Sequence, residues 1–315
     1  GGKVILPANI CYAAVLPVLY AGLEPVFCDV DALSGNATTA AVAAAVTADT
    51  VAAIIPHMYG NPVRELPEIA ALLQARGIPL IEDCASLMAR DGAAYVPGMV
   101  GDYVVYSTGY SKTIDIGMGG LLFSRGHDLA VQEETEKSFP AYRPEYEQIW
   151  STFSKTYRSL RNEGQDTERA KAVYARLPES FRASFAFAAD PLFKKKILSS
   201  IDALDEVIRE RRRQCALYRA LLDLPAEKAY AFAPDAVPWR FNLFAGEERA
   251  ALIRFCLERR LPISDWYPSV VPIFPCGGSF PGAEEHEKKI LNFPLMISDE
   301  QIGEICGAVR AFYAR

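Results

Sequence analysis

Two side chains that could do chemistry together follow neighbouring apolar runs in the first half of the chain. Asp83 comes two residues after the run Pro79–Ile81, and Lys112 comes five residues after Ser107, which ends the run Tyr103–Ser107. Ligands of open α/β sheets bind at the carboxyl ends of the strands, so we expect these side chains to face one site. A lysine amine in a desolvated site has a lowered pKa and can add to a carbonyl carbon, and a neighbouring acid can hold a ring nitrogen in its protonated form.

An acid and an amine on adjacent strand ends are the pair that pyridoxal 5′-phosphate (PLP) chemistry requires. In that interpretation Lys112 forms a Schiff base with the cofactor and then carries a proton, and Asp83 keeps the pyridine nitrogen protonated so that the ring accepts electrons. Residue types alone leave two plainer interpretations open. A strand-end Asp often caps a helix or forms a turn, and a single Lys is often solvated.

The elements that must position this pair alternate between strand and helix patterns over residues 1–125. Several runs are apolar nearly throughout, which is typical of parallel strands covered on both faces, and Gly22 and Gly77 stand where helices would end. The pattern predicts an α/β fold with a mostly parallel sheet. The expected strands are Val4–Leu6, Pro25–Cys28, Val51–Pro56, Pro79–Ile81, Tyr103–Ser107 and Leu121–Ser124, and the expected helices are Ala13–Ala21, Ala40–Val46 and Leu66–Arg76.

The second half of the chain changes character. Between residues 139 and 160, large apolar side chains recur at three- and four-residue intervals, which predicts an amphipathic helix whose aromatic stripe packs on a core or on a subunit partner. The alternative is that these aromatic side chains stack on a bound ligand. A charged stretch, Arg161–Lys171, then precedes a long helical pattern from Ile197 to Leu222 and a mixed α/β tail that contains Trp239–Phe244, Ala250–Arg260 and Gln301–Ala311.

Composition argues against several classes of protein. The 315 residues are 50% hydrophobic and 23% charged, which is ordinary for a folded globular chain, and the net charge of −6 argues against a nucleic-acid partner. No stretch is apolar for the roughly 18 residues that a membrane span needs, and no signal peptide opens the chain. Seven cysteines without a C-x-x-C pair fit free thiols in a reducing compartment, so we expect a cytoplasmic protein.

Other candidate sites have little support in the sequence. No G-x-G-x-x-G follows a strand, which argues against a nicotinamide enzyme, and three histidines without close spacing argue against zinc or another metal centre. We interpret His57, which follows a predicted strand, as structural. The basic run Arg209–Arg213 lies in a helical pattern one turn after Asp205 and Glu206, which predicts a solvated helix face.

A set of segments distributed along the chain carries a family resemblance through its order and spacing. The segments are Pro7–Gly22, Pro25–Asp31, Ile54–Gly60, Ile81–Ala85 and Gly101–Ser107, then Lys112, Gly119–Gly120, Trp239–Phe241, Trp266–Pro268 and Asn292–Leu295. Together they resemble the DegT/StrS-type nucleotide-sugar aminotransferases, which are PLP enzymes of fold type I. The match runs over residues 3–125 and resumes at Leu204–Leu222 and in the tail.

The resemblance implies both a fold and an activity. The fold is a three-layer, PLP-transferase-like large domain with a mostly parallel sheet over residues 1–200, followed by a smaller C-terminal α/β domain over residues 201–315. The activity is transamination of a keto-sugar carried on a nucleotide, with an amino acid, glutamate, as the amino donor, in a homodimer with shared active sites. Relatives that act as sugar dehydratases have His in place of the lysine, so Lys112 favours transamination.

The resemblance assigns a contact with the cofactor to five residues of this chain. Lys112 would form the Schiff base, Asp83 would pair with the pyridine nitrogen, and Ser107 would donate to the phosphate. The aromatic that stacks on the cofactor ring in the family falls one position before Tyr12, which makes Tyr12 its substitute. The family's Gln, which reaches the phenolic oxygen of the cofactor, is replaced by Ser86.

Departures from the family pattern support a rival interpretation, a non-catalytic or truncated paralogue that keeps the fold and the dimer surface. The family's Glu before the Gly-Gly pair is Met118, its Gly-Tyr-Asn-x-Arg segment is not visible between residues 170 and 200, and its Ser-Gly-Thr phosphate loop has no counterpart in the chain. We therefore expect the large domain to lack its usual N-terminal segment and to bind PLP poorly, and an upstream extension with such a loop to restore tight binding. Retention of Asp83 and Lys112 favours catalysis.

Overall fold

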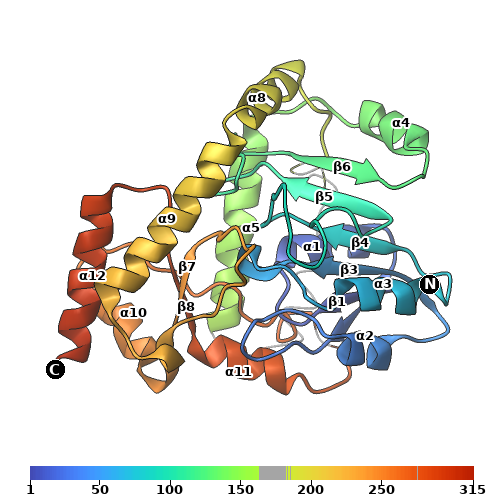
Figure 1. The fold of residues 1–315 in the computed structure, drawn as a ribbon. Coiled ribbons are helices and arrows are strands. Elements are labelled where there is room, and N and C mark those ends of the chain that lie inside the picture. The colour runs from blue at the N-terminus through green and yellow to red at the C-terminus, as the bar shows by residue number, and fades with distance from the viewer. Residues whose placement is uncertain (163–181, 183, 185, 275) are drawn as a thin grey trace.

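The structure is a mixed α/β fold built on a six-stranded sheet (Figure 1). The computed structural model describes residues 1–162, 182, 184, 186–274 and 276–315. The strands are β1 (Lys3–Pro7), β2 (Glu24–Cys28), β3 (Thr50–Pro56), β4 (Leu80–Asp83), β5 (Tyr103–Ser107) and β6 (Gly120–Ser124). They lie in the order β2-β1-β3-β4-β5-β6, and β6 alone of the six runs antiparallel to its neighbour. This confirms the predicted mostly parallel sheet.

Side chains of β1 alternate between the two faces of the sheet, as the two-residue period of a strand requires. Val4 and Leu6 belong to a core cluster with α1 (Tyr12–Tyr20), whereas Ile5 belongs to the cluster on the other face with α3 (Leu66–Gln74). Both faces of the strand are therefore buried, which explains its unbroken apolar run.

The three helices predicted in the first half are present. The bounds of α1, α2 (Thr39–Ala45) and α3 differ by at most two residues from the predicted ones. Gly22 and Gly77 follow α1 and α3 at φ values of 69° and 67°, a left-handed conformation that glycine adopts without a steric penalty. In Figure 1, α2 and α3 cover one face of the sheet and α1 covers the other.

The predicted aromatic helix begins later than expected. α4 (Ala130–Ser138) ends just before Phe139, and α5 (Glu145–Asn162) begins six residues after it. Pro140 and Pro144 lie between them, and proline both lacks an amide donor and disfavours a helical conformation in the residue before it. Two residues of the aromatic stripe, Phe153 and Tyr157, are buried against α1, so packing on a core is confirmed for them. The charged stretch beyond residue 162, up to residue 171, lies outside the described residues.

The C-terminal part forms a second hydrophobic cluster. β7 and β8 pair antiparallel there, and α9, α10 and α12 pack around them. The long helix expected over Ile197–Leu222 is two helices, because the chain breaks at Asp202 and Ala203. The elements are α8 (Pro191–Ile201), α9 (Leu204–Leu222), a short 3-10 turn (Ala226–Lys228), β7 (Phe241–Phe244), another 3-10 turn (Gly246–Glu248), α10 (Arg249–Glu258), α11 (Pro281–Lys289), β8 (Ile290–Phe293) and α12 (Asp299–Tyr313).

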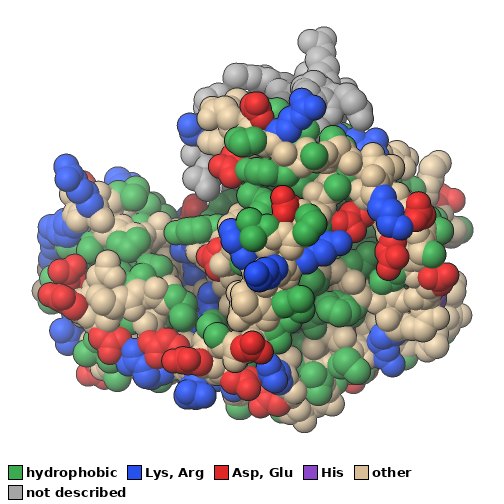
Figure 2. All heavy atoms as spheres, turned by 90° about the horizontal axis from the view of Figure 1, so that it is seen from above, with side chains coloured by type: hydrophobic (Ala, Val, Ile, Leu, Met, Phe, Trp, Pro, Cys, Tyr) green, Lys and Arg blue, Asp and Glu red, His purple; other side chains and the backbone are tan. Residues whose placement is uncertain are grey.

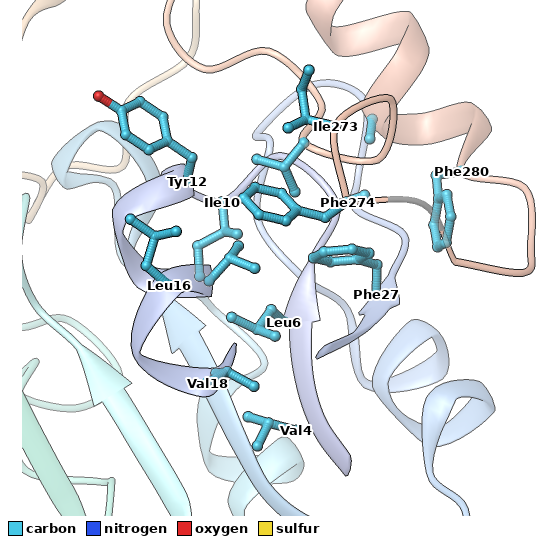
Figure 3. Packing of buried hydrophobic residues seen from close by; sticks show 14 of the residues in the cluster. Val4, Leu6, Ile10, Tyr12, Leu16, Val18, Phe27, Ile273, Phe274 and Phe280 are labelled. Atoms are coloured by element: carbon cyan, nitrogen blue, oxygen red, sulfur yellow. The ribbon is translucent and has the colours of Figure 1, made fainter. Parts of the chain in front are cut away.

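One C-terminal segment crosses back onto the first half of the chain. Ile273, Phe274 and Phe280 pack against Phe27 of β2 and the residues of α1, as Figure 3 shows. The amide of Val270 donates to the carbonyl oxygen of residue 8 at 2.8 Å. Because residues 270–274 and Phe280 pack on β2 and α1, residues 266–268 just before them lie close to the ends of the central strands.

The surface carries charges of both signs. In the face drawn in Figure 2, Lys and Arg side chains are interspersed with Asp and Glu. In the basic run of α9, Arg209 and Arg213 are exposed as predicted, but the expectation of a solvated face is wrong for Arg211, which is only 3% exposed. Among the described residues, no helix combines the length and the apolarity needed to cross a membrane.

Candidate active site

Asp83 and Ser107 end adjacent strands, and the turn after Ser107 carries Lys112. β4 pairs in parallel with β5, with Asp83 opposite Val105, so the acid lies beside the strand that leads to the lysine. Beyond β5, Ser111 takes up a φ of 64°, and the Lys112 amide donates to the carbonyl oxygen of residue 109 at 3.2 Å. A tight turn therefore returns the lysine side chain toward the ends of the strands.

The Lys112 amine lies in a half-buried position between polar and aromatic neighbours. Its Nζ donates to the Ser86 hydroxyl at 3.2 Å and lies 5.3 Å from the centre of the Trp239 ring. Burial lowers the pKa of the amine, and the positive charges of Arg211 and Arg240 act in the same direction, while Asp83 and the Cys11 thiol oppose them. A larger fraction of this amine is consequently deprotonated at neutral pH than of a solvated lysine.

Asp83 is the acid of the pair. Its Oδ1 accepts a hydrogen bond from the Ala85 amide at 2.8 Å. Burial raises the pKa of the carboxyl group, while that hydrogen bond and the charge of Lys112 act against the rise. Asp83 and Lys112 thus each alter the pKa of the other, so the structure brings together the two residues that the sequence singled out.

Ser86 joins the lysine to a residue from the C-terminal part of the chain. The Tyr267 hydroxyl is hydrogen bonded to Ser86, whose oxygen also accepts from Lys112. Tyr267 is 7% exposed, its ring stacks on that of Trp239 at 5.3 Å, and its amide donates to the Tyr59 hydroxyl at 3.0 Å. Neither Tyr267 nor Trp239 had an expected role, although both lie in tail segments that match the family order.

Arg240 adds a second cation beside the lysine. Its guanidinium lies 4.6 Å from the centre of the Trp239 ring, and its Nη1 donates to the Ser264 hydroxyl at 3.3 Å. Within the described part of the chain, its buried Nε has no hydrogen-bond partner and no carboxylate forms an ion pair with it. A guanidinium in this condition is suited to an anionic ligand.

The two residues at the start of α1 have different surroundings. Cys11 lies close enough to Lys112 and Asp83 for their charges to act on its thiol, and burial raises the thiol pKa. The Tyr12 ring instead packs in the core, 4.1 Å from the ring centre of Tyr157, and its hydroxyl shares a hydrogen bond of 2.8 Å with Ser154. Figure 3 shows Tyr12 on α1, near Ile10 and Phe274. The sequence-predicted substitute for a stacking ring is therefore packed against α5.

His57 and Glu82 form a buried pair behind the site. The Val63 amide donates to His57 Nδ1 at 3.0 Å, so Nε2 carries the ring proton and donates to Glu82 at 2.9 Å. Burial pushes the pKa of Glu82 up, but the hydrogen bonds from His57 and from backbone amides of residues 98 and 101 hold it below its usual value. Although Cys84 lies near this pair, a metal ion would have to displace these bonds, which fits a structural His57.

A mostly parallel six-stranded sheet with one antiparallel edge strand gives the chain the fold of solved aminotransferases of the fold type I class. The chain belongs to the DegT/DnrJ/EryC1/StrS aminotransferase family, whose sequence model matches residues 1–310.

Similar proteins support this placement. A pleiotropic regulatory protein of Geobacillus stearothermophilus is 25% identical over 99% of this chain and 79% of its own length. The dTDP-4-dehydro-2,3,6-trideoxy-D-glucose 4-aminotransferase of Saccharopolyspora spinosa is 28% identical over 94% of this chain and 73% of its own. The crystal structure of the aminotransferase TlmJ from Streptoalloteichus hindustanus superposes with a TM-score of 0.78 at 24% identity, covering 99% of this chain and 79% of that one.

Proposed function

We propose that this chain is a PLP-dependent aminotransferase that transfers the amino group of an amino acid, with glutamate as the donor, to the keto group of a sugar carried on a nucleotide. The observation that carries the proposal is the half-buried pair of Lys112 and Asp83 at adjacent strand ends, with Lys112 Nζ held by Ser86 at 3.2 Å. A family relative from Saccharopolyspora spinosa is named for such a sugar substrate.

The residues at the strand ends fit the cofactor. When bound, PLP supplies a carbonyl carbon for an amine and a ring that takes up electrons from the reacting carbon of the substrate. Lys112 would hold it covalently, Asp83 would accept a hydrogen bond from the protonated ring nitrogen, and Ser107 would donate to the phosphate. Ser86 would contact the phenolic oxygen. Because Tyr12 is packed against α5, we propose that it supports the start of α1, where Cys11 would face the cofactor ring.

Lys112 would also move the proton of the reaction. Once the amino group of the donor has displaced it from the cofactor, a deprotonated Nζ can take the proton from Cα of the amino acid, and its lowered pKa increases the share of that form. Ser86 and Tyr267 hold the amine at one place while it does so. Trp239 and Tyr267 come from the C-terminal part of the chain, and their stacked, buried rings exclude water from the side of the amine that they cover.

We expect borohydride reduction of the chain mixed with PLP to attach the cofactor to Lys112. Its amine has the lowered pKa that carbonyl addition needs and retains some exposure, so the aldehyde can reach it. Peptide mass spectrometry locates the adduct, and absorbance of the mixture before reduction measures its formation. Attachment at another lysine, or at none, would contradict the assignment and would favour the non-catalytic paralogue.

Arg240 supports an amino donor that carries a carboxylate. Its positive charge lowers the pKa of Lys112, which places the guanidinium near the amine, and none of the described carboxylates neutralises it. In an amino acid the carboxylate is bonded to the reacting Cα, whereas the diphosphate of a nucleotide sugar lies across the sugar ring from a reacting keto carbon. A cation close to the reacting amine therefore suits the amino acid better.

We expect Arg240→Met to raise the KM for the amino-acid donor by about 10- to 100-fold, because the donor loses one or two charge-assisted hydrogen bonds. Arg240→Lys should recover part of this loss because the charge remains while the planar fork does not. Steady-state kinetics with each substrate varied in turn measures the effect, and Arg254→Met, on the exposed surface of α10, is the control. A change in the KM of the nucleotide sugar alone would assign Arg240 to the diphosphate instead.

We propose further that the enzyme works in the cytoplasm as a homodimer and that its large and small domains meet between residues 200 and 201. The seven cysteines are all free thiols, which suits a reducing compartment. The separate hydrophobic cluster of residues between Cys215 and Val309 supports the domain division. Light scattering of the purified protein tests the dimer.

A further inference from the structure

Arg211 of α9 is a buried cation, and in the part of the chain that the structure describes its hydrogen bonds all go to backbone carbonyl oxygens. It is 3% exposed, and no carboxylate in the described ranges lies within ion-pairing distance of it. One terminal nitrogen, Nη2, donates to the carbonyl oxygens of Ser111 at 3.0 Å and of Lys112 at 2.9 Å. The other, Nη1, donates to those of Pro238 at 3.3 Å and of Trp239 at 2.9 Å. One guanidinium thus joins the turn that carries the lysine to the segment that carries the ring beside it.

The turn needs such support. Ser111 is a non-glycine residue at a φ of 64°, a conformation that costs free energy unless neighbouring groups hold it. Asp115 accepts the Ser111 amide at 2.7 Å, and Arg211 donates to the carbonyl oxygen of the same residue. Both backbone groups of the strained residue are therefore bound, one of them from a different part of the chain.

We infer that Arg211 is a positioning residue for the Lys112 amine: its planar fork holds the carbonyl oxygens of Ser111 and Lys112 against those of Pro238 and Trp239, and so sets where Nζ lies. The inference rests on the proposed function, in which Lys112 is the reacting amine. Lysine at position 211 could not reproduce the role, because an ammonium has no rigid fork that reaches four carbonyl oxygens.

The charge of Arg211 adds an electrostatic effect to the geometric one. Burial lowers the pKa of its guanidinium to about 10, so the group still carries its charge at neutral pH. That charge and the charge of Arg240 from the segment before β7 lower the pKa of Lys112, whereas Cys11 at the start of α1 and Asp83 at the end of β4 raise it. Removing the charge of Arg211 alone therefore raises the Lys112 pKa, and replacing it by lysine preserves the effect in part.

Two variants and one control separate the fork from the charge. Arg211→Met removes both, and Arg211→Lys removes the fork alone. Arg212→Met is the matched control, because the neighbouring Arg212 also holds backbone carbonyl oxygens, those of Asp235 at 3.1 Å and Ala236 at 2.9 Å, but none in the lysine turn. Amide hydrogen exchange of residues 108–117 measures order in the turn, since the Ile116 amide donates there to the carbonyl oxygen of Thr108 at 3.0 Å.

The reactivity of the Lys112 amine is measured by trace acetylation of the full chain, without added cofactor. Hydroxylamine first removes any bound aldehyde. Mass spectrometry across a pH series gives the reactivity of the amine. We expect both Arg211 variants to speed exchange in residues 108–117 by about tenfold or more while β1 stays protected. We expect Arg211→Met to lower acetylation of Lys112 at neutral pH by about three- to tenfold, as the deprotonated fraction falls, and Arg211→Lys to lower it less.

Each outcome decides a different point. Unchanged exchange of residues 108–117 in the Arg211 variants, or an equal rise in Arg212→Met, would overturn the inference. A rise spread over the whole sheet would show general destabilisation and would overturn it as well. If Arg211→Met does not fold, Arg211→Lys decides by the exchange measurement alone. If Lys112 of the unaltered chain reacts no faster at neutral pH than the other lysines, the proposed function fails whatever the Arg211 variants do.

Discussion

Lys112→Met should abolish transamination, with a loss of at least about 10³-fold, or roughly 4 kcal/mol of transition-state stabilisation. Methionine keeps an unbranched stem against the Trp239 ring but has no amine, so neither covalent attachment of the cofactor nor proton transfer from Cα can occur. The half-reaction, in which an amino acid becomes a keto acid, measures this loss by the change in cofactor absorbance. The borohydride adduct should disappear from the peptide that contains residue 112.

The fold should survive this change. Lys112 is half-buried with a pKa lowered by burial, so replacing its amine with a neutral group removes a desolvation cost rather than a stabilising ion pair. Lys3→Met is the control, because Lys3 opens β1 at the opposite end of the same sheet. A folded Lys112→Met variant with more than a few per cent of the unaltered activity would exclude Lys112 as the reacting amine.

Asp83→Asn should lower turnover by about 100-fold or more, roughly 3 kcal/mol, while leaving the fold intact. The amide has nearly the shape of the carboxyl group and its oxygen can still accept the Ala85 amide, so the turn after β4 should form. A neutral amide cannot, however, hold a ring nitrogen in its protonated form. The kinetics of the half-reaction and the absorbance of the bound cofactor report the loss.

Asp102→Asn is the matched control for Asp83→Asn. Asp102 lies just before β5, at the other end of the same strand pair, and its Oδ2 accepts the Leu80 amide at 2.8 Å. It therefore has a comparable hydrogen bond to the backbone but is far from the carboxyl ends of the strands. Activity close to that of the unaltered chain is expected for Asp102→Asn, and similar losses in the two variants would mean that Asp83 acts only through the fold.

Local sequence patterns were sufficient for the sheet and for the central pair. Apolar runs predicted all six strands. For β1 the physical reason is burial of both faces, whereas β5 and β6 are apolar although several of their side chains are exposed. The strand-end rule then singled out Asp83 and Lys112, since parallel neighbours bring their carboxyl ends to one edge whatever else the chain does. The prolines before α5 were visible in the sequence as well, but the three- and four-residue period extended past them and placed the helix start at 139 instead of Glu145.

The burial of Arg211 could have been predicted from the sequence, because Arg211 lies in an apolar stripe of α9. Leu204, Ile208, Cys215, Tyr218 and Leu222 are the buried residues that share its stripe along α9, at three- and four-residue intervals. An arginine inside such a stripe must be buried and must find acceptors. The expectation for Arg209–Arg213 was wrong because it treated these side chains as one solvated group, although Arg211 faces inward.

The sequence by itself determined which strands the chain forms and which acid and which amine follow adjacent strands, that is, which two side chains could meet. The tertiary structure alone decided what surrounds them. Tyr267 reaches Ser86 across 181 positions because the segment after it packs back onto α1, and Arg211 reaches Lys112 because α9 crosses the lysine turn. Local periodicity carries no information on such contacts, because they depend on how whole elements pack and not on the residues next in sequence.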